Sequence, residues 1–242
     1  MEEHCQAILA DAQEKVTAGD PAIPVTTTVF IGPSTTALVE ASRHADLVVV
    51  GSRGLRAVPA FLIGATSLQV AAHAACPVVS VREGPLYHPG SSAVVVGVDG
   101  SPRSSDAIAF AYAYASAHAL NLKVLHAFQV EFVAGVISDL TAEQSNTRLG
   151  QEELALTAET VAGWQEKYPD VHVETVTQRD HPVDALVEAS AIADLLVLGG
   201  RRPNALGGAL LGSVSHGVLH AAHCPVAVVR AQPATAKPSV KR

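Results

Sequence analysis

Sulphur, aromatic rings and positive charge are all scarce in this chain of 242 residues. It has three cysteines, one tryptophan, and 16 Lys plus Arg against 23 Asp plus Glu, for a formal net charge of −7. Three widely spaced cysteines do not make a disulfide framework, so we expect reduced thiols and a cytoplasmic protein. The shortage of basic residues argues against a nucleic-acid groove, which needs clustered Lys and Arg to neutralise phosphates.

Long apolar segments are missing too. The most apolar predicted helix, residues 107–120, contains two tyrosines, a serine and a histidine, and it is too short and too polar to span a bilayer. The chain opens with MEEHCQAILADAQEK, whose early acids do not follow the basic-then-apolar order of a secretory signal. We therefore expect no membrane association, and the length leaves room for two domains with real cores.

One six-residue stretch, ALVEAS, occurs twice, at 37–42 and at 185–190. Comparing residues 37–82 with residues 185–230, at this spacing of 148, needs no gap and gives 23 identities in 46 positions. A period of this size indicates a repeated domain, because solenoid units are typically about 20 to 50 residues long. The chain is therefore predicted to contain an internal duplication.

Short apolar runs alternate with helical patterns through the second copy. Ser101-Pro102 supplies a helix cap and a first-turn proline, and the aliphatic run at 195–198 ends in two glycines, as in a strand buried on both faces. The pattern predicts a parallel, doubly wound α/β sheet. Its predicted strands are 93–98, 122–128, 171–177, 195–198 and 225–229; its predicted helices are 101–119, 141–168, 182–193 and 213–222.

Ligands of open α/β sheets bind at the carboxyl ends of the strands, and two loops meet that description here. One is Val98-Asp99-Gly100-Ser101, and the other is the glycine-rich segment 199–213, which runs into a helix. Glycines let backbone amides approach an anion, the helix start offers free N–H groups, and a carboxylate suits ribose hydroxyls. The pattern favours a nucleotide pocket; the alternative is that the glycines only make tight turns.

The order VVGVDGS (95–101), VLHA (124–127), GSVS (212–215) and HCPVAVVR (223–230) resembles the universal stress protein family. The resemblance covers residues 1–230 as a tandem pair. It implies a Rossmann-like sheet with strand order 3-2-1-4-5 and, as in some members, bound ATP, with Mg²⁺ as an option. The residues that it assigns to the nucleotide are Gly97, Val98, Asp99, Ala127, Gly199, Arg202, Gly212, Ser213, Val214 and Ser215.

Each copy departs once from the family's glycine-loop pattern. Arg202 stands where the family has its second loop glycine, so that either a strained backbone costs roughly 1 kcal/mol or the arginine compensates by facing the phosphates. The first copy keeps the glycine spacing with Gly51, Gly54 and Gly64, but Ala65 replaces the small hydroxyl residue. At most one standard ATP site is expected, in the second copy.

The first copy also has no counterpart of residues 93–128, which hold two central strands and the helix between them. Its predicted strand at 25–30 is thereby separated from the one at 47–50. The first half is expected to rearrange, to borrow strands from another chain, or to belong to a longer parent, and we favour the last two. The predicted domains are an incomplete copy at 1–84, a complete copy at 91–231, and a flexible tail at 232–242.

Other reactive residues have simpler interpretations. His216, His220 and His223 share a helical spacing that zinc ligands use, but the first copy has Leu and Ala at these positions, so no metal site is predicted. Cys76 and Cys224 each precede Pro-Val and are interpreted as buried small side chains. No catalytic set is assignable, so we do not expect an enzyme.

Three functions follow from these patterns. The first is a stress-response protein that binds ATP or another adenine nucleotide in its second domain and acts through regulated assembly or an unknown protein partner. The second is a nucleotide-free scaffold that dimerises through its last strands, since a homo-oligomer is expected. The third is a slow nucleotide hydrolase.

Overall fold

The structure is a computed structural model that describes residues 2–51, 64–81, 93–101, 104–129, 158, 161, 163–200 and 211–230. The chain divides into two compact units, Met1–Ala37 and Leu38–Arg242. The first unit contains α1 (Glu2–Gly19) and the start of α2 (Ser34–Ala41). Most side chains of α1 are exposed, which is consistent with its low content of large apolar residues.

The strand predicted at residues 25–30 is wrong. These residues are described, and they adopt no regular secondary structure. The β-branched residues of this segment favour an extended backbone. A strand is stable, however, only when its N–H and C=O groups pair with a neighbouring strand. Its counterpart β5 pairs with β4, and β4 has no counterpart in the first copy.

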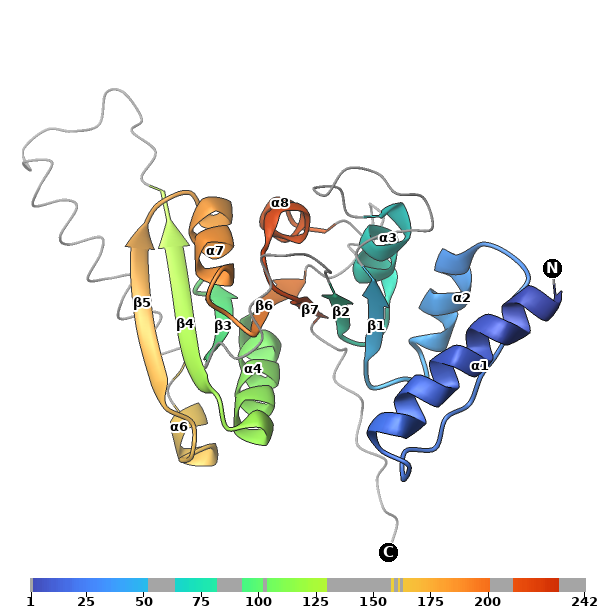
Figure 1. The fold of residues 1–242 in the computed structure, drawn as a ribbon. Coiled ribbons are helices and arrows are strands. Elements are labelled where there is room, and N and C mark those ends of the chain that lie inside the picture. Colours follow the sequence, from blue (N-terminus) through green and yellow to red (C-terminus); the bar gives the residue numbers. More distant parts are fainter. Residues whose placement is uncertain are drawn as a thin grey trace, which may run out of the picture. The chain divides into compact units, whose positions relative to one another are not determined.

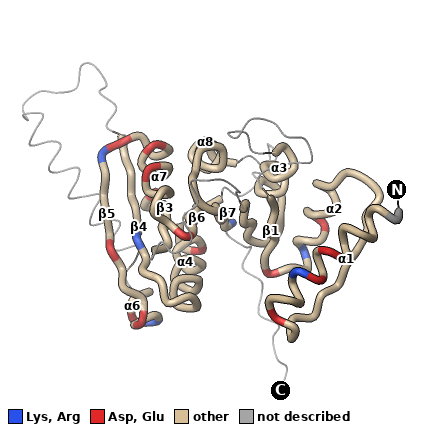
Figure 2. Tube along the Cα trace, viewed as in Figure 1, with Lys and Arg blue, Asp and Glu red and all other residues tan. Residues whose placement is uncertain are grey.

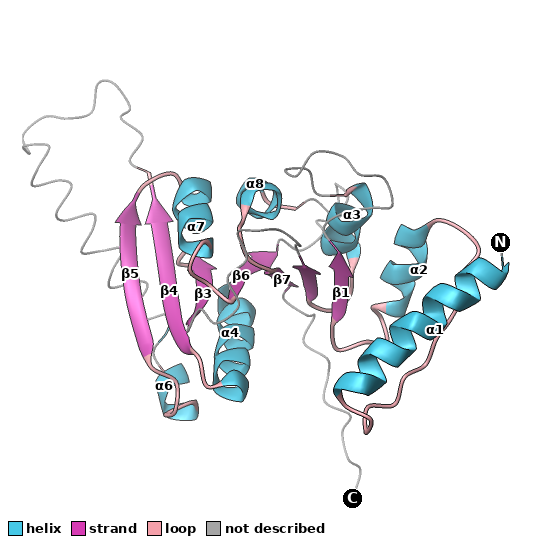
Figure 3. Ribbon diagram, viewed as in Figure 1, coloured by secondary structure: helices cyan, strands magenta, loops and turns pink. Residues whose placement is uncertain are grey.

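The second unit is built on one seven-stranded sheet with the order β1-β2-β7-β6-β3-β4-β5 (Figures 1 and 3). Every neighbouring pair is parallel except β2 with β7. Counted from β3, the last five strands lie in the order 3-2-1-4-5. The strands are β1 (Val48–Gly51), β2 (Val78–Val81), β3 (Ala93–Val98), β4 (Asn121–Phe128), β5 (Val173–Arg179), β6 (Leu195–Gly200) and β7 (Val226–Arg230).

Helices cover both faces of the part of this sheet that β3 to β7 form, as the predicted α/β class requires, and that class is confirmed. Two hydrophobic cores result, one under α7 and α8 and the other under α4. The central strands β3 and β6 are buried on both faces, which explains their unbroken aliphatic sequences. The helices of this unit are α3 (Ala65–His73), α4 (Ser105–His118), α6 (Trp164–Lys167), α7 (Pro182–Ser190) and α8 (Ser213–Ala221).

Most predicted elements of the second copy match the structure to within a few residues. Helix α4 begins four residues after the predicted start at Ser101, because the Asp99 carboxylate bonds to Ser101 and turns the chain first. The helix predicted at 141–168 lies largely outside the described residues, as do the tail and the domain boundary at 84–91. That boundary stays a prediction.

The two copies repeat their hydrogen bonds at the same spacing of 148 residues. The Ser42 hydroxyl accepts from the Ala75 amide at 2.8 Å, and the Ser190 hydroxyl accepts from the His223 amide at 2.9 Å. Val48 pairs with Val78 in β1 and β2, in the register of the β6 and β7 pair. Equivalent segments of the duplicated sequence therefore have equivalent local structures.

The strands β2 and β7 are the last strands of the two copies, and they pair with each other. Val78 lies opposite Val228 and Ser80 lies opposite Val226, so the register is symmetric about Val79 and Ala227. The first copy thus adds its two described strands to the sheet of the second copy. This is a rearrangement, the least favoured of the three expectations; a single chain does not test the other two.

Candidate functional site

A cavity of about 200 Å³ lies at the carboxyl ends of β3 and β6, beside the start of α8. This is the edge at which parallel α/β sheets bind ligands. Its described lining combines glycines, which expose their backbone, with two serines from α8, one carboxylate and several aliphatic side chains. The lining residues are Gly97, Val98, Asp99, Ser104, Leu125, Ala127, Pro182, Leu186, Leu198, Gly199, Gly200, Gly212, Ser213, Val214 and Ser215.

Asp99 follows β3 directly, and its carboxylate is held by the next turn of the chain. Oδ1 accepts hydrogen bonds from the Ser101 hydroxyl at 2.6 Å, the Ser104 hydroxyl at 2.9 Å and the Ser101 amide at 3.0 Å. Gly100 has φ of +69°, a backbone conformation that costs other residues about 1 kcal/mol or more. The turn therefore fixes an exposed carboxylate at the mouth of the cavity.

The N-terminus of α8 forms the opposite side of the cavity. Gly212 is the cap residue, no side chain among the described residues caps the helix, and its first turn contains no acidic residue. The first backbone amides of a helix have no intrahelical partners and carry partial positive charge. Ser215 is buried beside them, and its hydroxyl donates to the Gly199 carbonyl at 3.4 Å. This side of the cavity suits an anionic group.

The remaining wall is apolar and comes from β4 and α7. Leu125 and Ala127 are two residues apart on one face of β4, and Pro182 and Leu186 belong to the first turns of α7. Gly97 lies beneath them, and a Cβ placed there would stand 2.9 Å from Leu186 Cδ2. The missing side chain lets α7 approach β3 closely, which places Leu186 in the apolar wall of the cavity.

Arg230 contributes a basic group near this edge of the sheet. A Cβ at Gly200 would lie 2.7 Å from Arg230 Cγ, so the aliphatic part of this arginine packs directly over the glycine. Burial lowers the pKa of the Arg230 guanidinium from its ordinary value.

The structure brings together nine of the ten residues that the sequence assigned to the site; Arg202 lies outside the described residues. Sequence reasoning did not assign Ser104, Leu125, Pro182, Leu186, Leu198 and Gly200. A signal existed for Leu125, because it lies two positions before Ala127 on the same strand face. No local signal identifies the α7 residues, since only the packing of that helix on β3 places them at the cavity.

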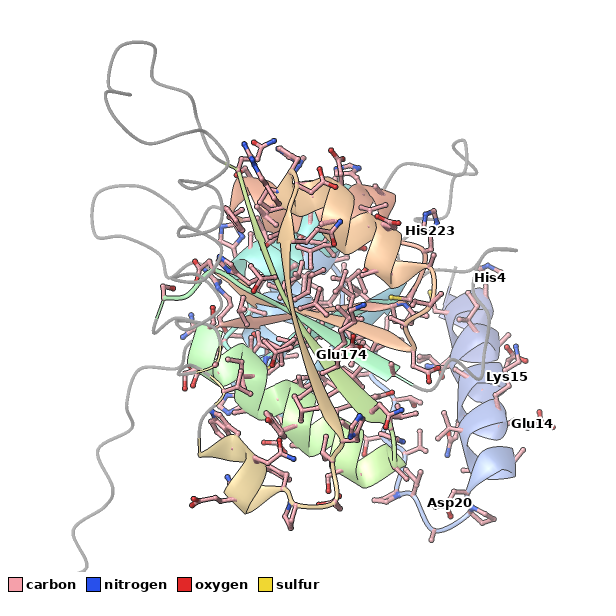
Figure 4. The ribbon with its side chains drawn as sticks, turned by 90° about the vertical axis from the view of Figure 1, so that its left-hand side faces the viewer. His4, Glu14, Lys15, Asp20, Glu174 and His223 are labelled. Atoms are coloured by element: carbon pink, nitrogen blue, oxygen red, sulfur yellow. The ribbon has the colours of Figure 1, made fainter. Side chains whose placement is uncertain are left out.

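The histidines and cysteines lie elsewhere. The His216 and His220 rings are 4.7 Å apart on α8, and His223 follows in the loop before β7 (Figure 4). The described residues contain no cluster of three side chains that could hold a metal ion. Cys76 and Cys224 are buried, and burial raises the pKa of the Cys76 thiol. Among the described helices, none has the length and apolarity needed to cross a membrane.

Comparison with known proteins identifies the group to which this arrangement is related. The family model described as universal stress protein family matches residues 1–82 and 91–230. A universal stress protein of Mycobacterium tuberculosis is 42% identical over 205 residues, which are 84% of this chain and 67% of the relative. Another from the same organism is 36% identical over 237 residues, 95% of this chain and 77% of the relative.

A solved structure has a similar fold. A universal stress protein from Archaeoglobus fulgidus has a TM-score of 0.68 to this chain at 20% sequence identity. The match covers 97% of this chain and 79% of the other. At this identity the likeness concerns the fold alone.

Proposed function

Because the chain belongs to the universal stress protein family, we propose that it is a cytoplasmic stress-response protein that binds ATP or another adenine nucleotide in the described cavity. The base lies against the apolar wall of β4 and α7, the ribose hydroxyls bond to Asp99, and the phosphates face the start of α8. Nucleotide binding then regulates the assembly of the protein or its interaction with a protein partner. The glycine-rich loop that contains Arg202 is proposed to be part of the same nucleotide site.

One observation carries this proposal: a fixed carboxylate, a helix N-terminus that no described side chain caps, and an apolar wall all line the same cavity. A nucleotide needs these three environments for its ribose hydroxyls, its phosphates and its base. Asp99 is the one carboxylate among the described lining residues, too few for a protein-only Mg²⁺ site. We therefore propose that Mg²⁺ arrives bound to the phosphates.

Calorimetric titration with ATP and Mg²⁺ tests the site through Asp99→Ala. The substitution removes the hydroxyl acceptor and loosens the turn at Gly100, so we expect affinity at least tenfold lower, about 1.4 kcal/mol. Asp106→Ala is the matched control, because Asp106 is an exposed carboxylate in the first turn of α4 and does not line the cavity. Equal effects of the two substitutions would contradict the assignment.

The duplication supplies a second matched pair for the phosphate side. Ser215→Ala removes the hydroxyl at the start of α8, and Ser67→Ala removes its counterpart, which donates to the Gly51 carbonyl at 2.7 Å in the first copy. We expect a several-fold loss of ATP affinity for Ser215→Ala alone, since the standard site lies in the second copy. If the wild-type chain binds no adenine nucleotide at millimolar concentration, the nucleotide proposal is contradicted and the nucleotide-free scaffold is favoured.

The scaffold function has less support. It requires dimerisation through the last strands, but β7 is paired on both edges, with β6 and with β2. A second copy would have to displace β2 to reach it. Slow hydrolysis is the third proposal, and phosphate release that scales with protein and disappears in Ser213→Ala would support it.

A further inference from the structure

Part of the first copy's sheet surface is exposed although its side chains are large and apolar. Leu47 is 41% exposed, Val49 in β1 is 58% exposed, and Val81 at the end of β2 is 37% exposed. Their side chains lie on the face of the sheet opposite α2 and α3. We call these three residues the open face.

The second copy shows what covers the same positions. The counterparts of the open face at the spacing of 148 are Leu195, Val197 and Val229, and they are 3%, 0% and 4% exposed. All three belong to the core under α4, together with Ala107, Ile108, Ala111 and Ala115 of that helix. The difference in exposure therefore arises because no described helix covers the first copy as α4 covers the second.

A strand edge that pairs with no other described strand adjoins the open face. β1 ends the described sheet, whereas its counterpart β6 pairs with β3 on that side. The Val48 amide donates to the Pro77 carbonyl on the β2 side at 3.0 Å, so alternation directs the Val49 amide outward. β1 has the sequence VVVG, without the charge or proline that usually protects an edge (Figure 2).

We propose that β1 and the open face together receive a strand followed by a helix from a partner polypeptide, with the chemistry of β3 and α4. The strand pairs in parallel with residues 47–50, in the register by which Val94–Gly97 pair with Leu195–Leu198. The following helix lays an alanine-rich face over Leu47, Val49 and Val81. The first copy is then an acceptor for strand addition, an interaction separate from nucleotide binding.

The geometry also sets a requirement on the incoming strand. In the second copy Gly97 pairs with Leu198, and Leu186 of α7 occupies the space that its side chain would need. The first-copy counterparts are Val50 and Leu38, and Leu38 packs into the core on that face. The incoming strand therefore needs glycine, or a comparably small residue, opposite Val50.

A labelled peptide of residues 91–120 is the probe, because it contains one complete β3–α4 unit. Mixed with the full chain, it is expected to bind and to slow hydrogen exchange of the Val49 amide at least tenfold. Val49→Asp in the chain is expected to weaken binding at least tenfold. Ile192→Asp, at another exposed aliphatic residue, is expected to leave binding unchanged. A peptide with Gly97→Leu is expected to bind at least tenfold more weakly.

Each alternative occupant gives a distinct result. Peptide binding that is indifferent to Val49→Asp means exchange with the chain's own β3–α4 unit and overturns the proposal. A dimer that Val49→Asp dissociates and the peptide does not displace places a second copy on the face, and also overturns it. So does a Val49 amide protected in the monomer without peptide, or no binding at about a hundred times the chain concentration. Circular dichroism of each variant separates these outcomes from misfolding.

Discussion

The serine that ends each ALVEAS copy has a role that its surroundings in the sequence do not reveal. The Leu and Val positions predict a helix packed on a sheet, which α2 and α7 confirm. Ser42 and Ser190 are both buried, and each hydroxyl donates to a carbonyl three residues earlier at 2.6 Å. Each also accepts the amide before the last strand of its copy. The serine joins two segments 33 residues apart.

Tyr112 is the largest fully buried side chain of α4, and its hydroxyl has no hydrogen-bond partner within the described part of the chain. Its ring stacks near Trp164 and Tyr168. Tyr112→Phe keeps these contacts and removes an unsatisfied polar atom. We expect the free energy of unfolding at neutral pH to stay equal or to rise by about 1 kcal/mol in urea titrations.

The same substitution should change the pH dependence. Burial raises the pKa of the Tyr112 hydroxyl, so the unfolded chain loses this proton at a lower pH than the folded chain. The contribution of this group to the free energy of unfolding is fully present below the ordinary tyrosine pKa of about 10, and it is lost as the pH rises above that pKa. We expect Tyr112→Phe to reduce that alkaline loss relative to wild type. An equal loss in both proteins would show that the hydroxyl is solvated.

Helix α7 reaches β3 because Gly97 has no side chain. Gly97→Ala would place a Cβ 2.9 Å from Leu186 Cδ2 and 3.0 Å from Leu198 Cδ2, and we expect it to cost about 1–3 kcal/mol. In a double-mutant cycle, Leu186→Ala should relieve part of this cost, with a coupling of about 1 kcal/mol. Additive costs would show that α7 shifts freely. Gly19→Ala, which meets no neighbouring atom, is the control.

The irregular segment at 25–30 and the displaced start of α4 have related causes. Residues 25–30 have the composition of a strand, but no described strand pairs with them. The serine and proline at 101–102 have the composition of a helix start, but the Asp99 carboxylate takes the Ser101 amide first. The first segment lacks the described pairing that would stabilise a strand, and in the second a turn hydrogen bond overrides the local helix preference.

In the second unit, the two copies share one sheet through a single antiparallel pair of short strands. Val79 lies opposite Ala227 at the centre of this pair and packs against the core under α4. Val79→Asp puts a carboxylate at the join. We expect amide exchange in β1 and β2 to accelerate at least tenfold, because no described helix covers Val49 of β1 or Val81 of β2, which are exposed.

The strands β3 to β7 keep helices on both faces, so we expect their unfolding midpoint to change little. Trp164, the single tryptophan, reports on this part by its fluorescence. Ser80→Thr, which keeps a hydroxyl in the same strand, is the control. Simultaneous loss of exchange protection and tryptophan signal would show that the sheet unfolds as one unit.

By itself, the sequence determined the α/β class, the duplication pattern, the strands of the second copy and nearly all of the proposed ligand loops. These are local or periodic properties: aliphatic runs, glycine positions and helix starts lie within a few residues of one another. Asp99 and the glycines before α8 could be selected because parallel strands bring their carboxyl ends to one edge. Of the apolar wall of the cavity, the sequence identified Ala127 of β4 but not the residues of α7.

Only the tertiary structure decided which distant surfaces meet. Pro182 and Leu186 reach the cavity because α7 packs on Gly97, and β2 pairs with β7 because both are edges of comparable length and register. The open face depends on the same kind of information, since Val49 and Val197 have the same residue type and differ only in what packs on them. Burial and pairing are properties of the assembled sheet, which no local pattern specifies.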